Sequence, residues 1–475
     1  MSVSEPQNAE GIGRFWSATI SLALATLLVS LGISIANVAL PDIAAFFGAE
    51  FAGTQWVVIS YLVTLSVFVV AAGRLGDIRG RRNVLVAGLI VFTLGSLLCA
   101  LAPSLSFLIG ARVIQGLGAS ALMALTLSIV RDVVPDDGVG TAMGFLGTVS
   151  AVGTALGPSI GGLLVGFGWQ AVFVFMSCMG VITTVIVTAM LPSKEQQQGG
   201  TARFDVIGMV LLGLSLAAYA LAMTGNAGFG MRELALLALT VALFVAFLSV
   251  ERRIDAPMVH PDRVRHDAPL AGGLVVNAIV AAVMMSTLVI GPFYLSGALG
   301  LNMAMVGMVM AIGPVISIFC GLPSGWLTDR FGAGIVATLG LILMIAGTTA
   351  LAILPPILGL TGYIGAIVLL TPGYQLFQAA NNTAVTARAD KSERGVISAL
   401  LGLSRNLGLV TGASLMGTIF ALSSGNLVAA TPDTLDVAIR NTFLVESFAL
   451  IAGLIIAIAT RAISLHSSKD HMPAE

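Results

Sequence analysis

The sequence has little charge. Only 9% of its 475 residues are Asp, Glu, Lys or Arg, whereas 57% are hydrophobic. A soluble domain carries about 25% charged residues, because charged side chains cover a water-facing surface. The few charges here lie in short gaps between long apolar stretches. Hydrocarbon must therefore surround most of the chain, and the composition excludes a soluble enzyme.

Lysine, histidine and cysteine are scarce as well. None of the three lysines stands in a GxxxxGK[ST] loop, so we expect no phosphate cradle and no direct use of ATP. The four histidines fall in loops or the tail, and the three cysteines lie singly in apolar stretches, which predicts no metal centre, disulfide or cofactor. The net charge of −1 gives no reason to expect nucleic-acid binding.

Fourteen apolar stretches approach the length that a membrane helix needs, which is about 20 residues. They predict an all-α integral membrane protein. The first stretch lacks the short core and cleavage site of a signal peptide, so we interpret it as a retained span. The predicted spans are Trp16–Leu40, Thr54–Gly73, Val84–Leu101, Leu105–Ile129, Thr141–Val165, Ala171–Leu191, Val206–Met223, Leu234–Val250, Leu270–Leu295, Met305–Leu327, Ile335–Leu354, Tyr363–Thr383, Val396–Leu422 and Thr442–Ser464.

The basic residues predict the topology independently. With the N-terminus in the cytoplasm and the spans alternating, all but four of the 22 Lys and Arg residues fall on the cytoplasmic side. Arg232 and Arg440 fall on the opposite side, and Arg112 and Arg405 fall inside spans. This asymmetry is what the positive-inside rule requires. It predicts an even number of spans and two cytoplasmic termini.

Two polar connectors divide the spans into six, two and six. They are Pro192–Arg203 and Glu251–Asp267. We therefore expect an N-terminal six-helix bundle at 1–191, a linker with two extra transmembrane helices at 192–267, and a C-terminal six-helix bundle with a short cytoplasmic tail at 268–475.

The two six-span halves resemble each other. The segment Gly73–Gly80 shares its glycine and aspartate spacing with Gly325–Gly332. Five glycines between 140 and 162 recur at one constant spacing between 395 and 417. Weakly similar halves of this kind are typical of secondary transporters, in which two pseudo-symmetric bundles rock around a site near the midplane.

The segment GRLGDIRGRR, Gly73 to Arg82, lies between the second and third predicted spans. Its glycines allow helix ends to approach, its aspartate can accept hydrogen bonds from a helix N-terminus, and its arginines can pair with that aspartate or with lipid phosphate. We interpret it, with its repeat, as a gating latch at the cytoplasmic face. The alternative is a charged turn that only fixes topology. The gating residues are Gly73, Asp77, Arg81, Arg82, Gly325, Asp329 and Arg330.

At these residues the chain resembles the major facilitator superfamily. ARVIQGLGAS (111–120) looks like its fourth-span motif, and AVGTALGPSIGG (151–162) is similar to its antiporter motif. SIANVALP (34–41), SRNLGLVTGASLMG (404–417) and the two inserted spans resemble the fourteen-span drug:proton antiporter branch. The resemblance implies a 6+2+6 fold in a bacterial cytoplasmic membrane. It also implies multidrug-efflux-like export of small amphipathic compounds in exchange for protons.

Glycines mark two spans for close packing. In the fifth span they recur every fourth residue, and a proline among them removes a backbone donor and can bend the helix. We expect the fifth and thirteenth spans to form the seam between the halves. Plain helix packing is the alternative. The helix-packing residues are Gly153, Gly157, Pro158, Gly161, Gly162, Gly408 and Gly412.

Two arginines stand inside predicted spans. Arg112 lies about two turns into the fourth span, with Gln115 on the same face, and Arg405 stands beside Asn406 in the thirteenth. A charge there is costly unless it faces a cavity or a partner. We predict that both arginines face the transport cavity and take part in proton coupling or substrate attraction. A structural charge bonded to helix carbonyls is the alternative.

Uncharged polar residues add candidates for the cavity lining. Tyr374, Gln375, Gln378, Asn381 and Asn382 share a broad face of the twelfth span, which should line a wet cavity or a helix interface. Asn37, Tyr61 and Asn277 are single polar residues of other spans, and a structural role is equally open for them.

One departure from the resembled branch concerns its proton carrier. Drug exporters of that branch carry an acid about five positions before the first-span asparagine, where this chain has Gly32. The remaining carboxylates are Asp42, at the end of the first span, and Glu446, a turn into the last. Either one can also be a solvated helix-end charge. Two arginines without a deep carboxylate suggest a preference for neutral or anionic amphiphiles over lipophilic cations.

Other functions stay open at this point. The chain can be a metabolite or siderophore exporter, or a facilitator without proton coupling. A membrane-embedded enzyme or receptor is the remote alternative, because no catalytic cluster or large polar segment is present. The expected partners are a small-molecule substrate, protons and the lipid bilayer, and a monomer is plausible.

Overall fold

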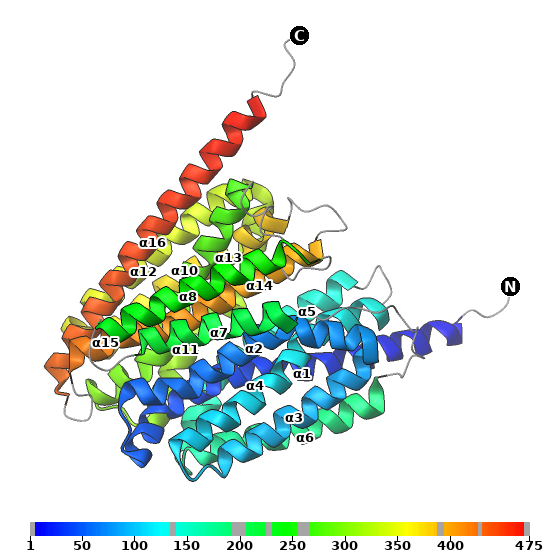
Figure 1. Cartoon of the computed structure of the whole chain (residues 1–475), viewed down its shortest axis with the longest axis horizontal. Coiled ribbons are helices and arrows are strands. Elements are labelled where there is room, and N and C mark those ends of the chain that lie inside the picture. Colours follow the sequence, from blue (N-terminus) through cyan, green and yellow to red (C-terminus); the bar gives the residue numbers. More distant parts are fainter. Residues whose placement is uncertain are drawn as a thin grey trace. The chain divides into compact units, whose positions relative to one another are not determined.

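The computed structural model describes residues 5–133, 139–191, 206–224, 230–254, 267–386, 394–425 and 430–469. Every element in these ranges is a helix (Figure 1). The first eight are α1 (Glu5–Phe47), α2 (Phe51–Arg79), α3 (Arg81–Ala100), α4 (Leu105–Val133), α5 (Val139–Val165), α6 (Gln170–Met190), α7 (Val206–Met223) and α8 (Met231–Glu251).

Six further spans follow. They are α10 (Ala268–Gly297), α11 (Met303–Phe331), α12 (Ala333–Leu358), α13 (Leu360–Thr386), the composite α14 (Arg394–Thr411), η1 (Gly412–Met416) and α15 (Gly417–Ser424), and α16 (Pro432–Lys469). Each predicted span coincides with one of these helices. The largest differences are in α1, which begins at Glu5 rather than near Trp16, and in α16, which begins at Pro432 rather than near Thr442.

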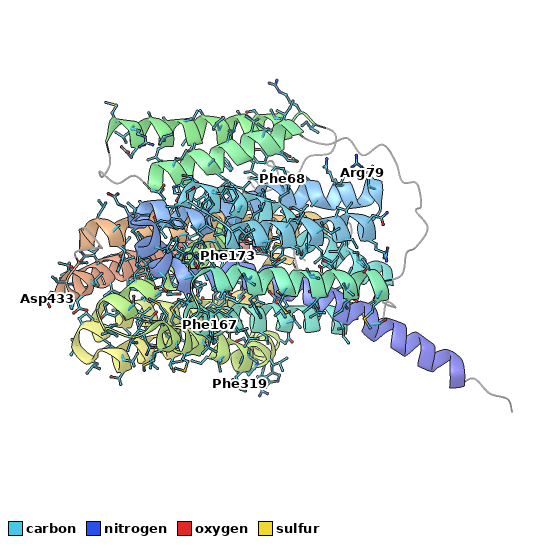
Figure 2. The ribbon with its side chains drawn as sticks, turned by 90° about the horizontal axis from the view of Figure 1, so that it is seen from below. Phe68, Arg79, Phe167, Phe173, Phe319 and Asp433 are labelled. Carbon is cyan, nitrogen blue, oxygen red and sulfur yellow. The ribbon has the colours of Figure 1, made fainter. Side chains whose placement is uncertain are left out.

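Length and apolarity suit these helices to a membrane. Twelve of them, within the described residues, are long and apolar enough to cross one, and Val152–Val165 and Ile207–Met223 are shorter apolar helices. Large apolar side chains face outward, as Phe319 of α11 does with 75% of its surface exposed (Figure 2). Lipid can cover such side chains at no cost, whereas water cannot. The expectation of an all-α integral membrane fold is confirmed.

Polar side chains inside the helices bond mostly to their own backbone. Ser34 donates to the Ser30 carbonyl at 3.1 Å, and Thr64 donates to the Ser60 carbonyl at 2.7 Å. These bonds satisfy hydroxyl groups that have no water to bind. At helix starts, Asn302 accepts from the Met305 amide and Asp267 accepts from the Leu270 amide, as N-caps do.

The chain divides into two compact units. Unit 1 comprises residues 1–43 and 56–204, and unit 2 comprises residues 44–55 and 205–475. Helix α3 contacts α4 and α6 in unit 1, as α12 contacts α13 and α16 in unit 2. This equivalence confirms the expected pair of pseudo-symmetric six-helix bundles. The division into 1–191, 192–267 and 268–475 stays a prediction.

The inserted helices α7 and α8 belong to unit 2 and contact each other along their length (Figures 1 and 2). Tyr219 of α7 donates to the Thr411 hydroxyl of α14 at 3.1 Å. The Thr418 hydroxyl of α15 donates to the Met223 carbonyl at the end of α7. The thirteenth span therefore holds α7 in unit 2.

The two copies of the Gly-Asp motif are helical rather than loops, which corrects the sequence-based expectation. Helix α2 continues through the first copy to Arg79, whose side chain Figure 2 labels, and α11 continues through the second to Phe331. Only Gly80 and Gly332 lie outside the helices, with φ of 91° and 83°. L-residues with a side chain rarely adopt positive φ, so glycine is required at both turns.

A π-helical turn interrupts the thirteenth span at Gly412–Met416. The Ala413 carbonyl in this turn accepts a hydrogen bond from Gln55 Nε2 at 2.6 Å. The ring of Phe51 lies edge-on to Phe293 at 4.7 Å between centroids and 6.0 Å from Phe420. These contacts attach the start of α2, residues 51–55, to unit 2.

Candidate functional site

Arg112 is buried inside unit 1, with 1% of its surface exposed. Its guanidinium donates to the Val57 carbonyl of α2 at 2.7 Å and to the Gly32 carbonyl of α1 at 3.1 Å. It also donates to Gln115 Oε1 on its own helix at 2.5 Å. The planar guanidinium of arginine has five N–H donors and can bond to acceptors in several directions. Acceptors on three helices therefore hold this cation without a carboxylate. This geometry fits the alternative of a charge bonded to helix carbonyls, and in this conformation the guanidinium is not exposed.

Aromatic and amide groups complete the surroundings of Arg112. Its guanidinium carbon lies 4.2 Å from the ring centroid of Tyr61, a cation–π distance, and 6.0 Å from Phe173, which Figure 2 labels. Gln115 Nε2 donates to the Ser96 hydroxyl of α3 at 2.8 Å. A rigid polar cluster therefore joins α1, α2, α3 and α4.

Gly32 has no room for a side chain here. A Cβ atom at this position would lie 2.7 Å from the Tyr61 hydroxyl and 3.2 Å from Tyr61 Cζ. The Tyr61 hydroxyl donates to the Val29 carbonyl at 3.3 Å. Tyr61 thus fills the space that an acidic side chain at position 32 would need. The Gly32 carbonyl accepts a hydrogen bond from Arg112.

Asn37 of α1 is buried, and its Nδ2 donates to the Ile33 and Ser34 carbonyls of its own helix at 3.0 and 3.3 Å. Its Oδ1 has no hydrogen-bond partner. An orphaned buried acceptor is uncommon and marks a place where a donor is missing.

Glu446 is the most deeply buried carboxylate that the structure describes. It stands on α16 in unit 2 with 0% of its surface exposed. The Ser286 hydroxyl of α10 contacts its Oε1, and its Oε2 has no hydrogen-bond partner. Asp42, the other sequence candidate, is half-buried near the end of α1. The structure therefore favours Glu446 over Asp42 as the internal acid.

The second arginine differs from the first. Arg405 of α14 is half-buried and has no side-chain hydrogen bond within the described residues, while its neighbour Asn406 is buried. Asn277 of α10 donates to the Leu401 carbonyl at 3.2 Å and to the Ser404 hydroxyl at 3.3 Å, and its Oδ1 has no partner. Arg405 is thus free to meet a ligand, whereas Asn277 joins two helices.

The polar face of α13 is only partly covered. Tyr374, Gln375 and Gln378 are half-buried, and Asn382 is exposed. Asn381 is buried, and its Nδ2 has no hydrogen-bond partner. Gln375, Gln378 and Asn381 therefore keep amide groups on this face that can bond to a polar molecule.

The glycine stripes pack helices within each unit. A Cβ atom at Gly153 would lie 2.9 Å from Ser30 Cβ, and one at Gly161 would lie 2.8 Å from the Ile35 carbonyl oxygen, both on α1. Gly157 meets Ser34 between them, and Pro158 and Gly162 beside them are buried.

In unit 2, Gly408 of α14 and Gly412 of η1 pack in the same way against the Ala278 and Ala282 carbonyls of α10. The stripes therefore bind the first helix of each bundle to the fifth.

The gating residues occupy different surroundings in the two copies. Arg82 donates to the Leu191 and Thr188 carbonyls at the end of α6, both at 2.7 Å, and Arg81 donates to the Ser128 carbonyl at 3.5 Å. The Asp77 side chain lies outside the described residues, and Gly73 is half-buried.

In the second copy, Asp329 and Arg330 are exposed and Gly325 has open space around its Cα. Arg330 lies over the Trp326 ring at 5.3 Å.

Sequence reasoning missed the partners of these residues. Ser286, Ser96 and the Val57 carbonyl carry the hydrogen bonds of Glu446, Gln115 and Arg112. A serine in an apolar span gives no signal of its partner, because serine commonly bonds to its own helix. Among the described residues, no group of three His, Cys, Asp or Glu side chains could hold a metal ion.

Comparisons with known proteins agree with this architecture. A bacterial homologue of the human lysosomal transporter Spinster, solved in an inward-facing and unoccupied conformation, superposes with a TM-score of 0.70 at 17% identity, over 97% of this chain and 98% of that one. The multidrug resistance protein Stp of Mycobacterium tuberculosis is 30% identical over 90% of this chain and 81% of its own length.

The riboflavin transporter RibZ of Clostridioides difficile is 29% identical over 86% of this chain and 89% of its own length. The family model described as Major Facilitator Superfamily matches residues 22–413 and 273–471. Helices, internal repeat and sequence match agree, and the chain is a membrane transporter that belongs to the Major Facilitator Superfamily.

Proposed function

We propose that the chain exports small amphipathic compounds in exchange for protons by alternating access. The observation that carries this proposal is that a span of each unit fully buries a charged residue type for which the described residues supply no ionic partner, Arg112 in unit 1 and Glu446 in unit 2. Ionisable groups in membrane spans are costly and mark ion or proton pathways. The relative named a multidrug resistance protein supports export of drug-like compounds.

The charge of the cavity supports a preference for neutral or anionic substrates. No acid stands at position 32, where Gly32 offers only its carbonyl to the buried Arg112. Arg405 adds a cation without a bonded partner, and Gln375 and Gln378 add amide groups. A lipophilic cation gains nothing from these groups, whereas a neutral amphiphile can bond to the amides.

Metabolite export is the second candidate function. The relative named a riboflavin transporter favours it, because riboflavin is an uncharged amphipathic molecule and suits the same cavity. A facilitator without proton coupling is the other alternative. These candidates differ in substrate or in dependence on the pH gradient.

Placement in the membrane is part of the proposal. We place both termini and the Gly73–Arg82 and Gly325–Arg330 segments in the bacterial cytoplasm, where those segments gate the inner face. The clustering of basic residues supports this orientation. The chain works as a monomer with lipid as its surroundings, and a seam role for the fifth and thirteenth spans stays a prediction, since their glycine stripes pack within each unit.

An efflux screen tests the proposal. Cells lacking their own exporters would express the chain and be loaded with neutral, acidic and quaternary ammonium fluorescent compounds, with and without a protonophore. We expect export of neutral or acidic compounds that stops when the protonophore collapses the gradient. Strong export of quaternary ammonium dyes alone would reject the charge preference, and export that survives the protonophore would reject proton coupling.

A further inference from the structure

The contact between Glu446 and Ser286 has a hydrogen count that limits its chemistry. Ser286 Oγ lies 2.8 Å from the Val283 carbonyl oxygen and also contacts Glu446 Oε1. A serine hydroxyl carries one hydrogen and can donate only one strong hydrogen bond. If that hydrogen points at Val283, the contact with Glu446 needs a hydrogen on the glutamate. If Glu446 is ionised, the serine hydrogen must turn toward it.

Other ionisable groups do not share this site. Within the described residues, α16 packs mainly against α10, α12 and α15, and Tyr294 is the only ionisable side chain on these three helices. Tyr294 donates to Asp436 of α16 at 2.7 Å, about 15 Å along the helix from Glu446. On α16 itself, Asp433, Arg440 and Arg461 are exposed. Among the described residues, Glu446 therefore has no cation to balance a negative charge, and its second oxygen has no partner.

The residue next to Glu446 has separate bonds. Ser447 donates to the Phe443 carbonyl at 2.8 Å and pairs with the Thr348 hydroxyl of α12 at 2.8 Å. These groups bind α16 to α12, whereas Ser286 binds α16 to α10. Ser447 is thus a natural control, because it is a buried serine contact of the same helix that does not touch the carboxyl group.

We propose that Glu446 and Ser286 form a proton-binding site that couples protonation to α10. In the loaded state, Glu446 is protonated on Oε1 and donates a hydrogen bond to Ser286 Oγ, while the Ser286 hydroxyl donates a hydrogen bond to the Val283 carbonyl. On release, the proton leaves Oε1 for water, the Ser286 hydroxyl turns to the carboxylate, and Val283 loses its side-chain donor. The proposal rests on the proposed proton-coupled export and names the site that carries the proton.

Infrared difference spectroscopy on the full chain in lipid vesicles, without substrate, tests this site directly. A protonated carboxylic acid has a carbonyl stretching band that an ionised carboxylate lacks. We expect a band that fades as the buffer is made alkaline and that Glu446→Gln removes. Ser286→Ala should change the band position and require more alkaline buffer for its loss, because the ionised form loses its one donor. Ser447→Ala should leave the band and its midpoint as in the parent protein.

Three results would overturn the site: no acid band assignable to Glu446 at any pH, a band that never fades, or a Ser286→Ala spectrum identical to the parent spectrum. Should Glu446→Gln fail to fold, Glu446→Asp keeps the acid one methylene shorter and assigns the band by moving it. Transport measured on the same vesicles separates the two proposals. A titrating Glu446 in a chain whose export ignores the pH gradient would reject proton-coupled export and leave the proton site standing.

Discussion

The two buried ionisable side chains, Arg112 and Glu446, differ in how far their hydrogen-bonding groups are satisfied. Arg112 donates to the Val57 and Gly32 carbonyls and to Gln115, so its charge is spread over fixed acceptors. Glu446 has a single hydroxyl contact and one orphaned oxygen. Three fixed acceptors hold Arg112 in its charged state, whereas a carboxylate buried without a cation is costly and a proton removes that cost. We therefore propose that Glu446 carries the proton and that Arg112 is a structural charge.

Replacing Arg112 tests this assignment. Arg112→Gln removes a donor from two helix carbonyls and from Gln115, and we expect it to lower the free energy of unfolding by about 1–3 kcal/mol. Arg405→Gln is the matched control, since Arg405 is half-buried without a bonded partner, and it should change stability by less than about 0.5 kcal/mol. Thermal unfolding in detergent measures both. Equal losses for the two variants would contradict the account of Arg112.

Gly32 and Tyr61 should show coupled effects. A methyl group at position 32 meets the Tyr61 hydroxyl at 2.7 Å, so Gly32→Ala should destabilise the fold. Removing that hydroxyl with Tyr61→Phe should recover part of the loss in the double variant, with a coupling free energy of about 0.5–3 kcal/mol. A double-mutant cycle on thermal unfolding measures it, and strict additivity would show that the two residues do not compete for space.

The sequence predicted which residues are unusual but not what they touch. Arg112 and Glu446 stand out because charge is rare in the spans. The carbonyls that hold Arg112 and the serine that meets Glu446 have no pattern of their own, since any residue has a carbonyl and serine is common in membrane helices. The sequence also could not predict how exposed Arg112 is. Its spacing predicted the helix face on which it lies, but not how deeply that face is buried.

At the scale of helices, glycine spacing determines which elements touch. The stripes of α5 and α14 meet the backbone of α1 and α10 at corresponding positions of the two bundles. Close backbone approach replaces the hydrophobic effect as a source of helix association in lipid. Larger residues would have to push the helices apart.

A pair of glycines in the thirteenth span tests this role. Gly412→Ala places a methyl group against the Ala282 carbonyl and Met285, and we expect it to destabilise unit 2 by about 1–3 kcal/mol. Gly402→Ala, in α14 of the same span, meets nothing within 4 Å, so it should be neutral or should stabilise by up to about 1 kcal/mol. Melting temperatures of the two purified variants give the comparison. A melting temperature of Gly412→Ala at or above that of Gly402→Ala would refute the packing role.

Hydropathy predicted the spans well because a bilayer requires long apolar helices. It could not show the π turn at Gly412–Met416, which depends on an added residue per turn rather than on polarity. It also missed that α2 runs on to Arg79, since glycine, aspartate and arginine are typical of loops in soluble proteins. Helix continuation there follows from packing, as Gly76 meets Leu125 closely.

For the whole molecule, topology follows from charge rather than from contacts. A reporter that works only in the cytoplasm should be active when fused after Lys194 or at the C-terminus, and inactive when fused near Gly168 or Gly300. Fusions to successive loops measure this pattern. Activity at Gly168 or Gly300 would reverse the orientation and place both Gly-Asp motifs outside the cell.

Proton-coupled export is the central claim, and a transport assay on the purified chain tests it most directly. The chain would be reconstituted in vesicles with an imposed pH gradient, a pH-sensitive dye inside and a neutral fluorescent substrate found by the efflux screen. We predict that the gradient drives substrate against its concentration, that each substrate movement carries protons the opposite way, and that Glu446→Gln abolishes both flows while substrate binding persists. Substrate movement at the same rate with and without the gradient, and no dye signal, would contradict the account.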